Sequence, residues 1–134
     1  MNNLLIKNTI SFNAFFNAKH FQIRHSRENG NDGFGTFKSM KKPCVYILAN
    51  QVRGTLYIGV TSDLIKRIWQ HKQHFVEGFS KEHQTHLLVY YELANNMLAT
   101  ITREKQLKKW NRAWKIELIE NINSKWRDLY LDLI

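Results

Sequence analysis

Two tyrosines and an arginine in the middle of the chain have side chains that can handle a phosphate and a proton. Tyr46 and Tyr57 lie eleven residues apart, in two short runs rich in β-formers, and Arg67 follows ten residues after Tyr57. A guanidinium suits two-point contact with a phosphate. A phenol can accept a proton from water if a nearby cation or metal lowers its pKa from about 10. The commoner roles of these residues are packing on a half-buried sheet and covering a helix edge.

Glu104 is the strongest single candidate for binding a metal ion. It shares the apolar stripe of a helix expected over residues 97–110, where a carboxylate is costly to desolvate unless it is paired or bound to a metal. The other members of that stripe are Leu98, Ile101 and Leu107. One carboxylate, several waters and phosphate oxygens often hold Mg²⁺. The alternative is a surface ion pair between Glu104 and Lys108, worth about 0.3–0.5 kcal/mol.

Histidines and lysines lie close to these candidates in the sequence. His71 comes four residues after Arg67, where it could act as an acid, a base or a phosphate contact. The four histidines of this region are His71, His74, His83 and His86. Their spacing fits no strong zinc pattern, so structural zinc is not expected. Lysines on the expected helices are candidates for binding nucleic acid: Lys72, Lys105 and Lys108.

The pattern of apolar residues and turn formers predicts the elements that carry these side chains. A hairpin with Gly54 in its turn places Tyr46 and Tyr57 in one small sheet. The expected strands are 44–50, 56–61 and 86–93. The first expected helix runs from a Ser62 cap to about Phe75, and two more cover residues 97–110 and 111–122. Residues 76–85 are expected to be a loop. The first helix is expected to bury Leu64, Ile65, Ile68 and Phe75. The predicted fold class is α+β: a small three-stranded antiparallel sheet flanked by helices, in the order β-β-α-β-α-α.

Length and composition limit the organisation of the chain. Its 134 residues suffice for one domain, and no apolar run approaches the ~20 residues of a membrane span. Residues 1–39 are expected to be a poorly ordered N-terminal extension, although their basic start would also suit a transit peptide; residues 40–134 form the predicted domain. Lys and Arg exceed Asp and Glu by nine, which favours a nucleic-acid partner. The single cysteine, Cys44, suits a reducing cytoplasm.

Five segments, taken in order, resemble the motifs of the GIY-YIG nuclease superfamily. The resemblance is to its small stand-alone bacterial members, which are similar to the N-terminal nuclease domain of an excinuclease subunit. The segments are CVY at Cys44–Tyr46, with cysteine where the motif has glycine; YIG at Tyr57–Gly59; VTSDLIKRIWQHK, which contains Arg67; ITREKQLKKW, which contains Glu104; and NSKWRDLY, with Asn123 and Trp126. Together they extend from about Lys42 to Tyr130.

The resemblance implies hydrolysis of a phosphodiester bond with a single divalent ion, Mg²⁺ or Mn²⁺. It implies that Tyr46 accepts a proton from the attacking water, that Tyr57 helps to position this water, and that Arg67 holds the phosphate. Glu104 would bind the metal ion. His71 occupies a position where some members carry a functional histidine, and Asn123 would contact the nucleic acid.

The resemblance and the length of the chain also lead to an expectation about the substrate. Because no appended DNA-recognition domain is visible, we expect a cytoplasmic endonuclease that recognises structure rather than sequence. DNA is expected in preference to RNA, with DNA repair as the process. Two other functions stay open at this point: a non-catalytic nucleic-acid-binding module, which the basic helices support equally well, and an adaptor in a repair complex.

Overall fold

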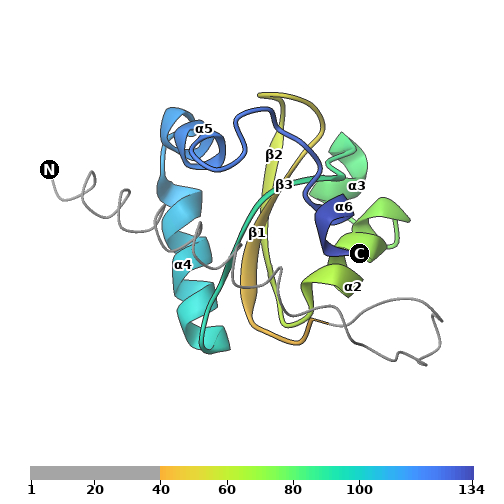
Figure 1. The fold of residues 1–134 in the computed structure, drawn as a ribbon, viewed down its shortest axis with the longest axis vertical. Helices are drawn as coiled ribbons and strands as arrows, with labels where there is room; N and C mark the ends of the chain where they lie inside the picture. The colour runs from red at the N-terminus through yellow and green to blue at the C-terminus, as the bar shows by residue number, and fades with distance from the viewer. Residues whose placement is uncertain (1–39) are drawn as a thin grey trace, which may run out of the picture.

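The computed structural model describes residues 40–134, and the N-terminal extension predicted for residues 1–39 lies outside the described residues. The described chain folds into one sheet with helices on both of its faces (Figure 1). None of the helices in this part of the chain combines the length and the apolar character needed to cross a membrane.

The sheet has three antiparallel strands, as predicted. They are β1 (Cys44–Ala49), β2 (Leu56–Thr61) and β3 (Leu87–Leu93), in the spatial order β2-β1-β3. All six residues of the central strand β1 are buried, because this strand pairs with a neighbour on each side and both of its faces are covered. Strand β2 pairs only with β1 in the described part of the chain, so it forms a free edge of the sheet.

Helices form a layer on each face of the sheet. Helices α4 (Met97–Lys109) and α5 (Arg112–Glu120) lie on one side, and α2 (Leu64–Lys72), α3 (Phe79–His83) and α6 (Tyr130–Leu133) lie on the other (Figure 1). The α+β class is therefore confirmed. Helix α3 falls in the segment predicted as a loop, and α6 was not predicted at all; helices of four or five residues are too short to show a periodic pattern.

Alternation along β1 divides the apolar residues into two cores. Side chains that follow one another along a strand point to opposite faces. Val45 and Ile47 therefore join the core under α4 and α5, while Tyr46 and Leu48 join the core under α2 and α6. The alternation places the Tyr46 phenol on the α2 side of the sheet, in front of the helix that carries Arg67.

Helix α2 is shorter at both ends than the sequence suggested. Asp63, not Ser62, is the N-cap, and its carboxylate accepts a hydrogen bond from the backbone N–H of Lys66. The helix ends at Lys72, and two residues later His74 takes a left-handed backbone conformation. Leu64, Ile65 and Ile68 are buried as expected. Phe75 follows the reversal of the chain and is 64% exposed, so its predicted burial was wrong.

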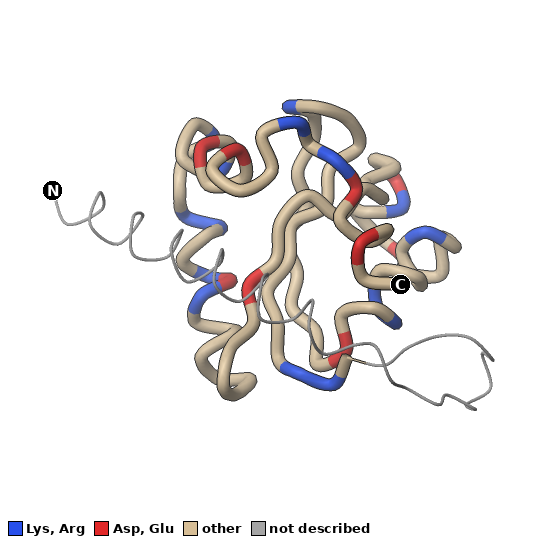
Figure 2. Tube along the Cα trace, viewed as in Figure 1, with Lys and Arg blue, Asp and Glu red and all other residues tan. Residues whose placement is uncertain are grey.

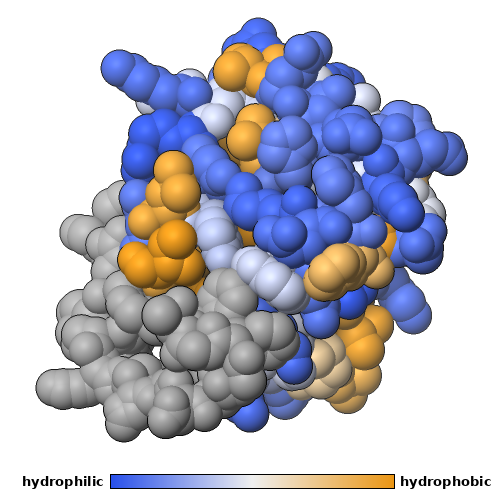
Figure 3. All heavy atoms as spheres, turned by 90° about the vertical axis from the view of Figure 1, so that its right-hand side faces the viewer, coloured by the Kyte–Doolittle hydropathy of each residue, from blue (hydrophilic) through white to orange (hydrophobic). Residues whose placement is uncertain are grey.

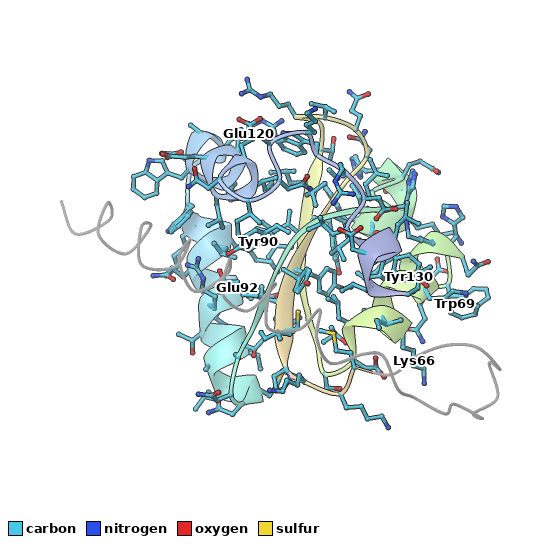
Figure 4. The ribbon with its side chains drawn as sticks, in the orientation of Figure 1. Lys66, Trp69, Tyr90, Glu92, Glu120 and Tyr130 are labelled. Atoms are coloured by element: carbon cyan, nitrogen blue, oxygen red, sulfur yellow. The ribbon has the colours of Figure 1, made fainter. Side chains whose placement is uncertain are left out.

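Helix α4 is rotated relative to the predicted apolar stripe. Leu98, expected inside, is 75% exposed. The residues that face the sheet are Thr100, Arg103, Leu107 and Trp110. Arg103 lies in this stripe because Glu92 of β3 accepts hydrogen bonds from its Nε and Nη2, and Tyr90 donates a hydrogen bond to the same carboxylate. Figure 4 shows Tyr90 and Glu92 directed from β3 towards α4.

Basic residues are not collected on one face. Lys and Arg occur in both helical layers and at both ends of the sheet (Figure 2). The surface over α2 and α3 is largely hydrophilic where it is visible, with separate small hydrophobic patches (Figure 3). The distribution of charge therefore does not locate the functional site, which has to be found from the local arrangement of side chains.

Candidate active site

The register of the hairpin pairs Tyr46 of β1 with Gly59 of β2. The two residues are partners in the β1–β2 ladder, and the Tyr46 side chain is completely buried. A Cβ atom at position 59 would lie 2.6 Å from Tyr46 Oη and 2.7 Å from its Cζ, closer than real Cβ contacts come. Only glycine leaves this space. Gly59 belongs to the YIG motif that was recognised in the sequence. That it makes room for the Tyr46 ring depends on the register between β1 and β2, which was not predicted.

Three rings gather at this point of the sheet. Tyr57 lies two residues before Gly59, on the same face, and its ring centroid is 6.3 Å from that of Tyr46. The His71 imidazole, carried by α2, is 5.2 Å from the Tyr57 centroid and 5.7 Å from the Tyr46 centroid. Of the side chains named from the sequence, this cluster contains Tyr46, Tyr57 and His71, whereas Arg67 lines a different surface hollow from Tyr57 and Glu104 lines neither of the two hollows.

A chain of hydrogen bonds runs through His71. Its Nε2 is 2.9 Å from Tyr46 Oη, and its Nδ1 is 2.9 Å from Ser80 Oγ in α3. The Ser80 hydroxyl donates its only proton to the Thr85 carbonyl, 3.2 Å away. Ser80 Oγ also accepts from the Thr85 hydroxyl at 3.0 Å, and its remaining lone pair can accept from His71 Nδ1–H; on this network we assign the tautomer in which Nε2 accepts the Tyr46 proton. Ser80 was missed from the sequence because its segment was expected to be a loop.

Burial keeps both members of the Tyr46–His71 pair uncharged. Burial raises the pKa of the Tyr46 phenol well above its ordinary value, and the nearby Arg67 offsets this only in part. Burial, together with the positive charge of Arg67, lowers the pKa of His71 to about 4. Near pH 7 the imidazole is therefore a neutral acceptor beside a protonated phenol. The pair can pass a proton from Tyr46 to His71 when the phenol accepts one from elsewhere.

Arg67 lies one helical turn before His71 and has an unused donor. Its Nη1 donates to Gln70 Oε1 at 3.4 Å. Its Nε is buried without a hydrogen-bond partner, which among residues 40–134 is true of no other buried side-chain nitrogen or oxygen. Arg67 also lines a hollow of about 590 Å³, where three basic residues, Lys41, Lys66 and Arg67, outnumber one acidic residue, Asp63. An anion is the ligand that this concentration of positive charge would attract.

A second hollow, of about 280 Å³, opens at the β2 edge of the sheet. We call it the edge hollow; it is lined by Leu56, Tyr57, Ile58, Phe79, Lys108 and Lys115. These residues come from β2, α3, α4 and α5, so the hollow connects the two helical layers across the unpaired side of β2.

Glu104 is tied to the edge hollow through Lys108. Its Oε2 lies 3.1 Å from Lys108 Nζ, one helical turn away, and its side chain is 17% exposed. The residues from 40 onwards contain no group of three His, Cys, Asp or Glu side chains that could hold a metal ion by themselves. Glu104 fits a divalent ion in a different way, as one carboxylate of a site whose remaining ligands are waters and phosphate oxygens. The structure also forms the ion pair that was the alternative prediction for this residue.

Three residues predicted to contact nucleic acid, Lys72, Asn123 and Lys105, do not line the edge hollow. The Lys72 ammonium is held by Asp128 Oδ2 at 2.5 Å and by the His86 carbonyl at 2.9 Å. The Asn123 amide is buried and donates to the carbonyls of Val89 and Arg127. Both side chains thus attach the C-terminal segment to β3 and α2. Lys105 is exposed on α4 and does not line the edge hollow.

Comparison with known proteins identifies relatives. Residues 42–117 match the family model described as the GIY-YIG catalytic domain. The chain is 34% identical over 82 residues to a protein of Syntrophus aciditrophicus (strain SB) named only as a UPF0213 protein, a match that covers 60% of this chain and 93% of that relative. No solved structure matches at a significant level. The family match contains Tyr46, Tyr57, Arg67, His71 and Glu104, whereas Asn123 lies beyond its end.

Proposed function

Because the chain belongs to the GIY-YIG catalytic domain family, whose activity is of the nuclease type, we propose that residues 40–134 form a metal-dependent endonuclease domain. The proposed reaction is hydrolysis of a phosphodiester bond in DNA. The observation that carries the proposal is the cluster of Tyr46, Tyr57, His71 and Arg67, in which every side chain can hold a proton or an anion.

The proton of the attacking water would leave through Tyr46. The phenol is hydrogen-bonded to a neutral imidazole, so it can accept the water proton at Oη while it gives its own proton to His71 Nε2. The transfer places a charge on His71 instead of on a phenolate. Because burial and the Arg67 charge lower the pKa of His71 to about 4, the negative phosphate bound by Arg67 would have to offset this charge. Ser80 holds the imidazole in the required tautomer. Tyr57, beside both rings, would help to orient the water.

Arg67 and Glu104 would act on the phosphate. Arg67 offers a guanidinium next to Tyr46 and His71, where it would contact a phosphate oxygen and stabilise the charge that develops in the transition state. Glu104 would hold the divalent ion, Mg²⁺ or Mn²⁺. When bound, the ion would supply charge neutralisation at the phosphate and at the leaving oxygen. Lys108 would have to give up or share the carboxylate that it contacts.

Recognition of structure rather than sequence is the second part of the proposal. The excess of nine positive charges favours a polyanion, and charge contacts with phosphates carry no sequence information. Branched, flapped and single-stranded DNA are therefore the substrates to try first. DNA is proposed over RNA because of the resemblance to nuclease domains of DNA repair.

Glu104→Gln is the decisive variant, and the chain offers a matched control. Glu77 forms the same kind of i,i+4 ion pair with Lys81, on the exposed segment at α3. Purified wild type, Glu104→Gln and Glu77→Gln would be incubated with labelled flapped, branched and single-stranded DNA and either Mg²⁺ or Mn²⁺. We expect wild type and Glu77→Gln to cleave and Glu104→Gln to lose at least about 10²-fold in rate. Equal cleavage by all three proteins would contradict the assigned mechanism.

A non-catalytic DNA-binding module is the second candidate, favoured by the Glu104–Lys108 ion pair. In such a module Glu104 would serve only that pair. The same proteins would then bind DNA in a salt-sensitive way without turnover, and Glu104→Gln would bind as tightly as wild type or more tightly, since it frees Lys108. Cleavage by the wild type that depends on Glu104 would exclude this candidate.

A further inference from the structure

We propose that the edge hollow takes an unpaired base of a DNA strand, stacked on Phe79. The inference rests on the proposed function and names its substrate class: DNA in which a nucleotide next to the cleaved link is unpaired. The observations that support it are an exposed aromatic ring, two lysines in the same hollow, and a shared boundary with the tyrosine cluster.

The Phe79 ring is exposed but held in place. It is 47% exposed and lines the hollow. The His83 ring stacks on it at a centroid distance of 4.0 Å and an interplanar angle of 19°, and the Tyr57 ring is nearly parallel to it, at 6.3 Å and 25°. The contact with His83 covers one face of the Phe79 ring and restricts its motion, so little side-chain freedom remains for a ligand to remove. Successive bases stack on such platforms in proteins that bind single strands.

The charge of the hollow suits a strand rather than an apolar peptide. Lys108 and Lys115 line it, and no carboxylate among residues 40–134 does. Lys115 makes no ion pair within the described part of the chain, and partial burial, together with the nearby Arg112, lowers its pKa. Two ammonium groups beside an aromatic ring combine the phosphate contact and the stacking surface that single-stranded nucleic acid requires.

The size and position of the hollow select one base near the reacting link. Its volume of about 280 Å³ lies at the lower limit of small-molecule pockets. A base paired inside a duplex has both faces covered by its neighbours, so only an unpaired or extruded base can stack there. Tyr57 lines the hollow and also contacts the Tyr46–His71 pair, and Lys108 is paired with Glu104. A base bound on Phe79 would therefore belong to a nucleotide close to the cleaved phosphate.

The test measures binding without turnover. Fluorescence anisotropy in EDTA would compare the full chain with Phe79→Ala and Phe79→Trp, on a labelled single strand and on the matching duplex. Phe75→Ala is the control, because Phe75 is a similarly exposed phenylalanine that does not line the hollow. We expect Phe79→Ala to weaken single-strand binding by about 5- to 150-fold, the fold-change of losing one base stack. Duplex binding should change less than about twofold, Phe79→Trp should bind the single strand at least as tightly as wild type, and Phe75→Ala should match wild type on both.

An equal loss on both DNA forms, or no loss on the single strand, would overturn the inference. Thermal melting of each variant separates a lost stack from a lost fold, and Phe79→Trp keeps the test valid if Phe79→Ala unfolds. The outcome is independent of cleavage. If the wild type does not cleave DNA but Phe79→Ala selectively loses the single strand, the proposed hydrolysis fails and the stacking site stands. If the wild type cleaves DNA and Phe79→Ala binds the single strand normally, the stacking site fails and the proposed hydrolysis stands.

Discussion

Gly59→Ala is the substitution that tests the tyrosine cluster most directly. The added Cβ would lie 2.6 Å from Tyr46 Oη, 2.7 Å from Tyr46 Cζ and 3.0 Å from a ring carbon of Tyr57. Tyr46 is completely buried in the central strand and cannot swing into solvent. The phenol must shift within the core, and the shift moves it relative to His71 Nε2, to which it is hydrogen-bonded at 2.9 Å.

The expected cost has a structural part and a catalytic part. Overpacking a core typically costs about 1–3 kcal/mol in the free energy of unfolding, and a weakened Tyr46–His71 hydrogen bond costs about 0.5–1.5 kcal/mol more. A protein with ordinary stability of about 5–15 kcal/mol remains folded after this loss. Catalysis should suffer more, because a misplacement of about 1 Å in a catalytic group can cost about 10²-fold in rate.

Gly54→Ala in the turn of the same hairpin is the matched control. A Cβ there would also be crowded, lying 2.1 Å from Asn50 Oδ1 and 2.6 Å from Gln51 Cγ, but these atoms belong to side chains of the turn itself. Displacing Asn50 breaks its hydrogen bond from the Thr55 N–H, a cost of about 0.5–1.5 kcal/mol, without moving a tyrosine. We therefore expect both variants to lose stability and only Gly59→Ala to lose activity.

Urea denaturation followed by circular dichroism would measure the stability of the two variants, and cleavage of flapped DNA at saturating substrate would measure the rate. If Gly59→Ala remains folded and cleaves as fast as the wild type, then the position of the Tyr46 phenol does not matter for the reaction. If Gly54→Ala loses as much activity as Gly59→Ala, the loss follows from weakening the hairpin and not from displacing Tyr46. Either result would refute a catalytic role for the Tyr46–Gly59 pairing.

Two further predictions concern buried polar groups. Arg103→Met leaves the buried Glu92 carboxylate without its guanidinium and should reduce the free energy of unfolding by about 3–5 kcal/mol, measured by urea denaturation. Adding Glu92→Gln to this variant should restore part of the loss. If it does not, the loss does not come from the unpaired carboxylate. His71 has a pKa of about 4 in the folded protein against 6.5 ordinarily, so the unfolded chain binds more protons between these values. Its contribution to stability is complete above pH 6.5 and is lost as the pH falls towards 4. Stability measured from pH 7 to pH 4 should therefore fall less steeply in His71→Gln than in the wild type, and equal slopes would contradict the lowered pKa.

Local sequence features were sufficient to predict the sheet and the approach of the two tyrosines. The alternating apolar runs on each side of Gly54 predicted the hairpin and placed Tyr46 and Tyr57 in one small sheet, while the register that puts them on a common face came from the structure. Arg67 and His71 followed from one helix that starts directly after β2. These relations span few residues, so the covalent chain and the two regular periods determine them.

The rotation of α4 was outside the reach of the sequence pattern. The periodicity suggested a stripe that contained Leu98, yet the structure exposes Leu98 and turns Arg103 inward. Arg103 has a partner eleven residues earlier: both carboxylate oxygens of Glu92 in β3 accept hydrogen bonds from its guanidinium.

The amino-acid sequence by itself determined the α+β class, the hairpin and the positions of the phenols and the guanidinium along it, since strand and helix periods act between near neighbours. Only the tertiary structure decided that Ser80 sets the tautomer of His71, that Phe79 stacks beside Tyr57, and that Lys108 connects Glu104 to the edge hollow. The physical reason is that the first two contacts join different elements, and the third depends on where α4 packs against the edge of β2. Their geometry depends on how the helices pack, which no local pattern of residues encodes.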